Sequence, residues 1–125
     1  MKCPVCEKTL IVVERDKIEL DWCHACGGFW FDSDEWRLLG VEDERFNPFA
    51  YPSIRVKGEK ARKCPICGKV MEKIKIGDTI LDRCPSLHGV WFDKGELSSF
   101  VNYSNSDEKS VETVNFLGEV FNMKK

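Results

Sequence analysis

The chain has 125 residues, seven of them cysteine, and a formal net charge of −2 at pH 7. That length ordinarily corresponds to one domain, and no apolar stretch is long enough to cross a membrane, so we expect no membrane span. The charge is uneven, because residues 14–44 carry ten acidic and three basic side chains and residues 54–76 carry eight basic and two acidic ones. The overall acidity argues against general DNA binding, while the basic stretch leaves local contact with phosphate groups open.

The cysteines form a grid that occurs twice, 61 positions apart. In each copy a Cys-x-x-Cys pair is followed by sixteen residues and then by a second group of ligand-type residues. Residues 2–39 and 63–100 share thirteen identities at this offset. Two such pairs separated by roughly 15–20 residues are typical of a zinc site, and a unit of this size usually needs a metal to fold. The chain is therefore expected to hold two small metal-stabilised units.

A β-hairpin is expected first in chain order. Residues 10–14 and 18–22 flank the weak turn Arg15-Asp16-Lys17, and the hairpin would bring the two cysteine pairs to one point. Gly28 is expected to let the chain turn tightly beside the metal. Trp30 and Phe31 are expected to cover the hairpin and shield the metal from water.

A short helix is expected after each hairpin. An acidic residue with glutamate three positions later is the pattern of a helix N-cap. The residues concerned are Asp32 with Glu35 and Asp93 with Glu96. The same four carboxylates could alternatively form a catalytic set, but their spacing favours capping.

Between the copies, residues 40–62 read as a linker. Its centre, residues 46–52, contains three aromatic residues and two prolines, which argue against a helix. The aromatic side chains are expected to pack on one of the two metal-stabilised units. The alternative is a docking segment whose rings stack on nucleic-acid bases beside the basic stretch.

In the second copy, residues 69–76 and 79–83 flank Gly77-Asp78, a good hairpin turn. Its fourth metal ligand is ambiguous, because Leu87 stands where the first copy has Cys26. We expect the chain to bulge over residues 85–87 so that His88 completes the site. The alternative is a three-ligand site with water in the fourth position, as in catalytic zinc.

The final segment, from Ser106 to residue 125, has apolar residues at helical spacing and predicts an amphipathic helix. Such a stripe either packs on its own domain or forms a dimer contact. No structure beyond this helix is predicted for the tail.

The predicted metal ligands are Cys3, Cys6, Cys23 and Cys26 at the first site, and Cys64, Cys67, Cys84 and His88 at the second. Two structural zinc ions fit these thiolate-rich sets best. Disulfides are disfavoured by the odd cysteine count. A mononuclear iron or iron–sulfur centre is disfavoured because the second set has only three cysteines, and His24 lies inside a complete set and needs no metal role.

Cys-Pro-x-Cys, a hairpin, and then Cys-x-x-Cys-Gly-Gly-Phe-Trp-Phe-Asp with glutamate three residues on resembles the prokaryotic zinc-ribbon family named for its likeness to the zinc finger of transcription factor IIB. The resemblance covers residues 2–39 and 63–100 and implies zinc binding and a ribbon fold, but little about activity.

The expected fold is mainly β with short helices: two tandem zinc ribbons and a C-terminal helix. The expected segments are ribbon 1 (1–39), linker (40–62), ribbon 2 (63–101) and tail (102–125).

The expected function is a non-enzymatic, cytoplasmic binding module with a protein partner, connected with transcription. Nucleic-acid binding through residues 54–76 is the first alternative. A redox sensor that uses its zinc thiolates is the second. Dimerisation through residues 106–125 is a further expectation.

Overall fold

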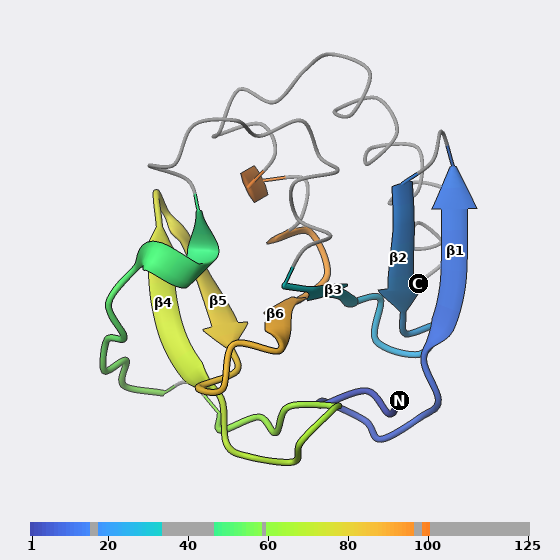
Figure 1. The fold of residues 1–125 in the computed structure, drawn as a ribbon, viewed down its shortest axis with the longest axis horizontal. Coiled ribbons are helices and arrows are strands. Elements are labelled where there is room, and N and C mark those ends of the chain that lie inside the picture. The colour runs from blue at the N-terminus through green and yellow to red at the C-terminus, as the bar shows by residue number, and fades with distance from the viewer. Residues whose placement is uncertain (16–17, 34–46, 59, 97–98, 101–125) are drawn as a thin grey trace.

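The computed structural model describes residues 1–15, 18–33, 47–58, 60–96 and 99–100. In this part of the chain, six strands form one antiparallel sheet in the order β1-β2-β3-β6-β5-β4 (Figure 1). The strands are β1 (Ile11–Arg15), β2 (Ile18–Trp22), β3 (Phe29–Asp32), β4 (Glu72–Ile76), β5 (Thr79–Arg83) and β6 (Gly89–Phe92). The fold is therefore mainly β, as the sequence predicts.

Each copy forms the predicted hairpin. In the first, β1 pairs with β2, with Val13 opposite Leu20. In the second, β4 pairs with β5, and Ile76 lies opposite Thr79. The second hairpin closes through two residues, of which Gly77 has a φ of 61°. This is the left-handed backbone that a tight hairpin turn requires and that glycine adopts without strain.

A third strand in each copy joins the two hairpins, and the sequence pattern does not predict this strand. β3 pairs with β6, and Trp30 lies opposite Trp91. These tryptophans occupy equivalent positions in the two copies, so the pairing has pseudo-two-fold symmetry about an axis that passes between them. Figure 1 shows β3 and β6 meeting in the middle, between the β1–β2 and β4–β5 hairpins. The two ribbons thus share one sheet.

The alternation of side chains along β3 and β6 builds a core on each face of this sheet. One face carries an aliphatic and aromatic cluster drawn from both copies, with Phe31 and Phe92 in T-shaped contact at 5.5 Å. The other carries Trp30, Trp91 and four of the cysteines. The expectation that Trp30 and Phe31 act as one cover is therefore wrong in part, because only the indole faces the cysteines.

The predicted cap of the second short helix is present. The Asp93 backbone N–H donates to the Glu96 carboxylate at 2.8 Å, which is one half of a capping box. A helical turn follows that includes Glu96, Ser99 and Phe100. The equivalent helix of the first copy and the tail helix from Ser106 lie outside the described residues. The proposed segment boundaries stay a prediction.

The linker packs on the second ribbon through a short 3₁₀ helix, η3 (Pro48–Ala50), which the two prolines had argued against. Proline fits there because it occupies the first turn, where its missing N–H is not needed. Pro48 is buried, and Phe49 and Tyr51 pack against the core. The expected packing of the aromatic side chains is therefore observed for these two residues.

Arg83 holds this segment in place. Its side chain is buried and donates to the backbone oxygens of Pro48, at 3.1 Å, and of Tyr51. Its guanidinium also pairs with Glu72 at 2.8 Å. One arginine of β5 thus fixes both the neighbouring strand and the linker.

Candidate metal centres

All four predicted ligands of the first copy converge on the face of the sheet that carries Trp30 and Trp91. Their sulfur atoms lie within 4.8 Å of one another, and the Sγ of Cys3 is 3.5 Å from that of Cys26. The Sγ atoms of Cys6 and Cys23 are 3.3 Å apart. A disulfide would bring two sulfurs to about 2.05 Å, so these contacts join free thiols.

The second copy also brings its four predicted ligands together. Cys64, Cys67, Cys84 and His88 place their donor atoms within 4.8 Å of one another. The Sγ of Cys84 lies 3.6 Å from that of Cys67 and 3.4 Å from Nδ1 of His88. His88 therefore lies where the fourth donor is needed, and Nδ1 is the ring nitrogen that faces the sulfur. His24 belongs to neither group and is exposed.

The chain reaches His88 through a tighter turn than the one it uses at Cys26. In the first copy the Gly27 N–H donates to the Cys23 carbonyl, four residues back, whereas in the second the Leu87 N–H donates to the Cys84 carbonyl, three residues back. Leu87 takes a left-handed φ of 61° and is half exposed. Both turns span the same number of residues. The Cys23 N–H donates to the Gly28 carbonyl, and the Cys84 N–H donates in the same way to the Gly89 carbonyl. The change is a tightened turn and not an inserted residue, so the expected bulge is replaced by strain at Leu87.

The loops that carry the first cysteine of each pair present backbone donors to sulfur. The N–H of Val5 donates to the Sγ of Cys3 at 3.3 Å, and the N–H of Ile66 donates to the Sγ of Cys64 at 3.4 Å. The Ser86 N–H does the same for Cys84 at 3.3 Å. Such bonds favour the charged thiolate, which is the form that binds a metal.

The pKa values of the cysteine ligands are also consistent with metal binding. The hydrogen bond between Cys3 and Cys26, followed by burial, raises the pKa of Cys3, and the same bond lowers the pKa of Cys26. At the second site the backbone N–H of Lys69 is the main cause that lowers the pKa of Cys67 to about 7, with His88 contributing. Burial raises the pKa of Cys64 to about 11. A bound metal would therefore displace protons from these sets.

Zinc fits both donor sets. With zinc–sulfur bonds of about 2.3 Å, sulfurs at the corners of a tetrahedron lie roughly 3.8 Å apart, and a sulfur and an imidazole nitrogen lie roughly 3.6 Å apart. The observed sulfur separations of 3.3 to 3.6 Å and the sulfur–nitrogen separation of 3.4 Å are close to these values. Each set offers four protein donors, which is the mark of a closed structural site. The two clusters are therefore suited to two structural zinc ions.

Each set of metal ligands is packed against a tryptophan of the other copy. A Cβ added at Gly28, which follows the Cys26 turn, would lie 2.1 Å from the Cζ2 of Trp91. A Cβ added at Gly89, which follows His88, would lie 2.5 Å from the Cζ2 of Trp30 and 2.2 Å from a backbone oxygen. These glycines make room for the neighbouring indole.

Gly28 therefore has a different role from the tight turn expected of it. The turn beside the metal is made by Gly27, whose φ is 82°. Both indoles are also tethered, since Nε1 of Trp30 and of Trp91 donates at 2.9 Å to Asp32 and Asp93 respectively. Asp93 accepts the hydrogen bond from Trp91 and also forms an ion pair with Arg62, so its carboxylate has a structural role.

The chain belongs to the transcription factor zinc-finger family, whose zinc-ribbon model of the transcription factor IIB type matches residues 2–39 and 63–103. The two matches coincide with the two copies of the cysteine grid, so the chain contains two tandem ribbons of this family. No curated protein and no solved structure matches the chain. Within the described residues, no helix has the length and apolar character needed to span a membrane.

Proposed function

We propose that the protein is a non-enzymatic zinc-stabilised module that recognises a macromolecular partner, with a protein as the partner. The closed donor sets support a structural role for zinc, because four protein ligands leave no position for a substrate or an activated water. The name of the family makes the transcription machinery the first class of partner to test.

The observation that carries the proposal is the apolar character of the loops that bridge the metal ligands. Each pair of ligands is bridged by a short loop, and each loop presents an exposed apolar residue. The four residues are Val5, Ala25, Ile66 and Leu87. Val5, Ile66 and Leu87 are 43%, 48% and 50% exposed. Exposed aliphatic side chains on loops that a metal holds rigid are suited to burial against a partner, because little conformational entropy is lost on binding.

The test compares partners captured from native extract by the zinc-loaded wild type and by a variant with Val5→Ser, Ile66→Ser and Leu87→Ser. The proposal predicts that both proteins hold two zinc ions and that the variant loses specific partners. Lys75→Glu, an exposed change on β4, serves as the control and should keep them. Identical sets of partners for the wild type and the triple variant would contradict the proposal.

Nucleic-acid binding is the second candidate, and the exposed basic residues favour it. Six of the eight basic residues in the 54–76 stretch are exposed: Arg55, Lys57, Lys60, Lys63, Lys69 and Lys75. The other two, Arg62 and Lys73, are held by the buried carboxylate of Asp82. Retention on single-stranded RNA or DNA that weakens steeply with added salt would support this candidate. No retention at low salt would remove it.

A further inference from the structure

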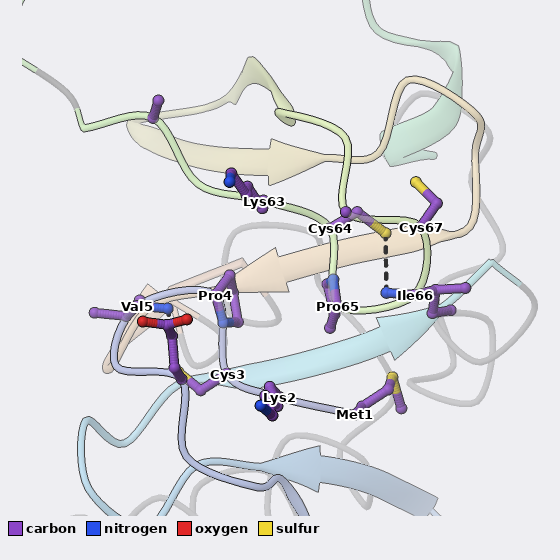
Figure 2. A pocket seen from close by; sticks show the side chains of 13 residues that line it. Met1, Lys2, Cys3, Pro4, Val5, Lys63, Cys64, Pro65, Ile66 and Cys67 are labelled. Atoms are coloured by element: carbon purple, nitrogen blue, oxygen red, sulfur yellow. Dashed lines mark hydrogen bonds between the residues drawn. The ribbon is translucent and has the colours of Figure 1, made fainter.

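A groove lies between the first loops of the two metal sites, the loops that carry Cys3 and Cys64. It has a volume of about 630 Å³ and is lined by equivalent residues from both copies. Figure 2 shows Pro4 and Pro65 in the middle of this groove, with Lys2 and Lys63 on its two sides. The groove thus follows the pseudo-two-fold symmetry of the sheet beneath it.

The lining of the groove is largely apolar, with Pro4 and Pro65 in its middle and Val5 and Ile66 at its two ends (Figure 2). Val5 and Ile66 both line it while remaining 43% and 48% exposed, and Met1 adds a further side chain at 46%. Their backbone is fixed, because Val5 and Ile66 donate to the buried sulfurs of the metal ligands. A volume of several hundred Å³ accommodates a few side chains of a peptide and is too small for a folded element.

The sides of the groove are basic. Lys2 and Lys63 are exposed, and their backbones are held by bridges to Thr9 and Val70. Glu7 is the acidic residue that lines the groove. Cys3 and Cys64 lie beneath the surface, 1% and 3% exposed, whereas Glu7 and the metal ligand Cys67 are exposed at the lining together with the two lysines. An apolar centre between two cations complements a segment with apolar residues in the middle and acidic residues on both sides.

We propose that this groove binds an extended acidic segment of a partner protein, with leucine-like side chains against Pro4, Pro65, Val5 and Ile66 and carboxylates paired with Lys2 and Lys63. The proposal rests on the proposed function and names the chemistry of the partner. It places the contact at the junction of the two ribbons, so both copies are needed for binding.

The test uses the full zinc-loaded chain labelled with ¹⁵N and three blocked hexapeptides. The probe is Asp-Glu-Leu-Leu-Glu-Asp; Asp-Glu-Ser-Ser-Glu-Asp lacks the apolar centre, and Lys-Lys-Leu-Leu-Lys-Lys reverses the charge. We expect the first peptide to shift the amide signals of Val5, Lys63 and Ile66 in a saturable manner, and the other two to leave them unchanged.

Variants then connect the signal to the groove. Lys2→Glu with Lys63→Glu is expected to raise the Kd for the leucine peptide by at least about tenfold, because two weak ion pairs become repulsions. Val5→Ser with Ile66→Ser is expected to have a similar effect. The matched controls are Lys75→Glu and Val12→Ser, which change exposed residues of the same types outside the groove and should alter the Kd less than about twofold.

The proposal is overturned if the leucine peptide shifts none of these signals, if the lysine peptide binds equally well, or if the groove variants bind it like the wild type. Displacement of the peptide pattern by an oligothymidine at the same amides would also overturn it in favour of nucleic acid. If the peptide does not bind but the loop-tip triple variant still loses its partners from extract, the groove proposal fails and the proposed function stands. If the peptide binds at the groove but the extract partners are unchanged, the proposed function fails instead.

Discussion

At the scale of the residue, His88 shows how the repeat tolerates the loss of a cysteine. The position equivalent to Cys26 holds Leu87, which points out of the site and is half exposed. The next residue in the first copy is Gly27, which has no side chain to offer. In the second copy His88 occupies that place, and its longer side chain brings Nδ1 to 3.4 Å from the Cys84 sulfur. The donor has moved one position along the chain, and the turn has tightened to accommodate it.

Replacing His88 by alanine should remove one of the four donors of the second site. Loss of an outer contact to a metal ligand typically weakens metal binding 10–100-fold, so loss of the ligand itself should cost on the order of 100-fold or more at this site. Competition with a chromogenic zinc chelator measures this directly. His88→Cys should restore tight binding, and His24→Ala should leave it unchanged. Two zinc ions per chain held at unchanged affinity in His88→Ala would disprove the assignment.

At the scale of the element, β3 and β6 make each ribbon part of the other's structure. The indole of Trp91 lies where a side chain at Gly28 would stand, and the relation is reciprocal for Trp30 and Gly89. Both indoles are fully buried on the face that carries the metal ligands. The environment of each metal site is therefore completed by the strand that follows the other site.

The contact between Gly28 and Trp91 can be measured by a double-mutant cycle. Gly28→Ala should lower the free energy of unfolding of the zinc-loaded protein by about 1–3 kcal/mol, because the new methyl group overlaps the indole. Trp91→Phe removes the overlapping atoms, so the double variant should lose less than the sum of the two single losses. Denaturant unfolding in excess zinc provides the values, and strictly additive losses would contradict the packing described.

Arg83 attaches the linker to the second ribbon. Replacing it by methionine should cost about 2–4 kcal/mol, because charged hydrogen bonds to Pro48, Tyr51 and Glu72 are lost and a backbone oxygen is left buried. Trypsin should then cleave faster at Arg55 and Lys57. Lys75→Met, an exposed change on β4, is the control and should leave the cleavage rate unaltered; equal rates for both variants would refute the role of Arg83.

At the scale of the whole molecule, two units of about 40 residues become one sheet with a core on each face. The aliphatic and aromatic core contains Val13, Leu20 and Phe31 of the first copy together with Ile74, Leu81 and Phe92 of the second. The metal face likewise draws cysteines from both. A ribbon that shares its sheet and both cores is not expected to unfold alone.

Much of the local structure could be predicted from the sequence, because spacing and turn chemistry act over short distances. The cysteine grid predicts both donor sets, and Gly77-Asp78 predicts the second hairpin. The pairing of β3 with β6 could not be predicted in the same way, since it joins residues some 60 positions apart and its continuous apolar run lacks the alternation of a half-buried strand. The packing role of Gly28 could not be predicted either, because the indole that needs the space belongs to Trp91 of the other copy. Arg83 gave no signal either, as its acceptors are backbone oxygens of the linker.

We expect two zinc ions to hold the ribbons as one cooperative unit, and stepwise removal of zinc is the decisive experiment. The measurement is a chelator titration of the ¹⁵N-labelled protein in which the indole signals of Trp30 and Trp91, one from each ribbon, are followed together with the zinc released. Structural zinc contributes roughly 10–16 kcal/mol of apparent binding energy in small zinc-finger peptides, so its loss should unfold this chain. We expect both signals to lose intensity together. Native dispersion without zinc, or ribbon 1 remaining folded after ribbon 2 has lost its metal and its structure, would contradict this expectation.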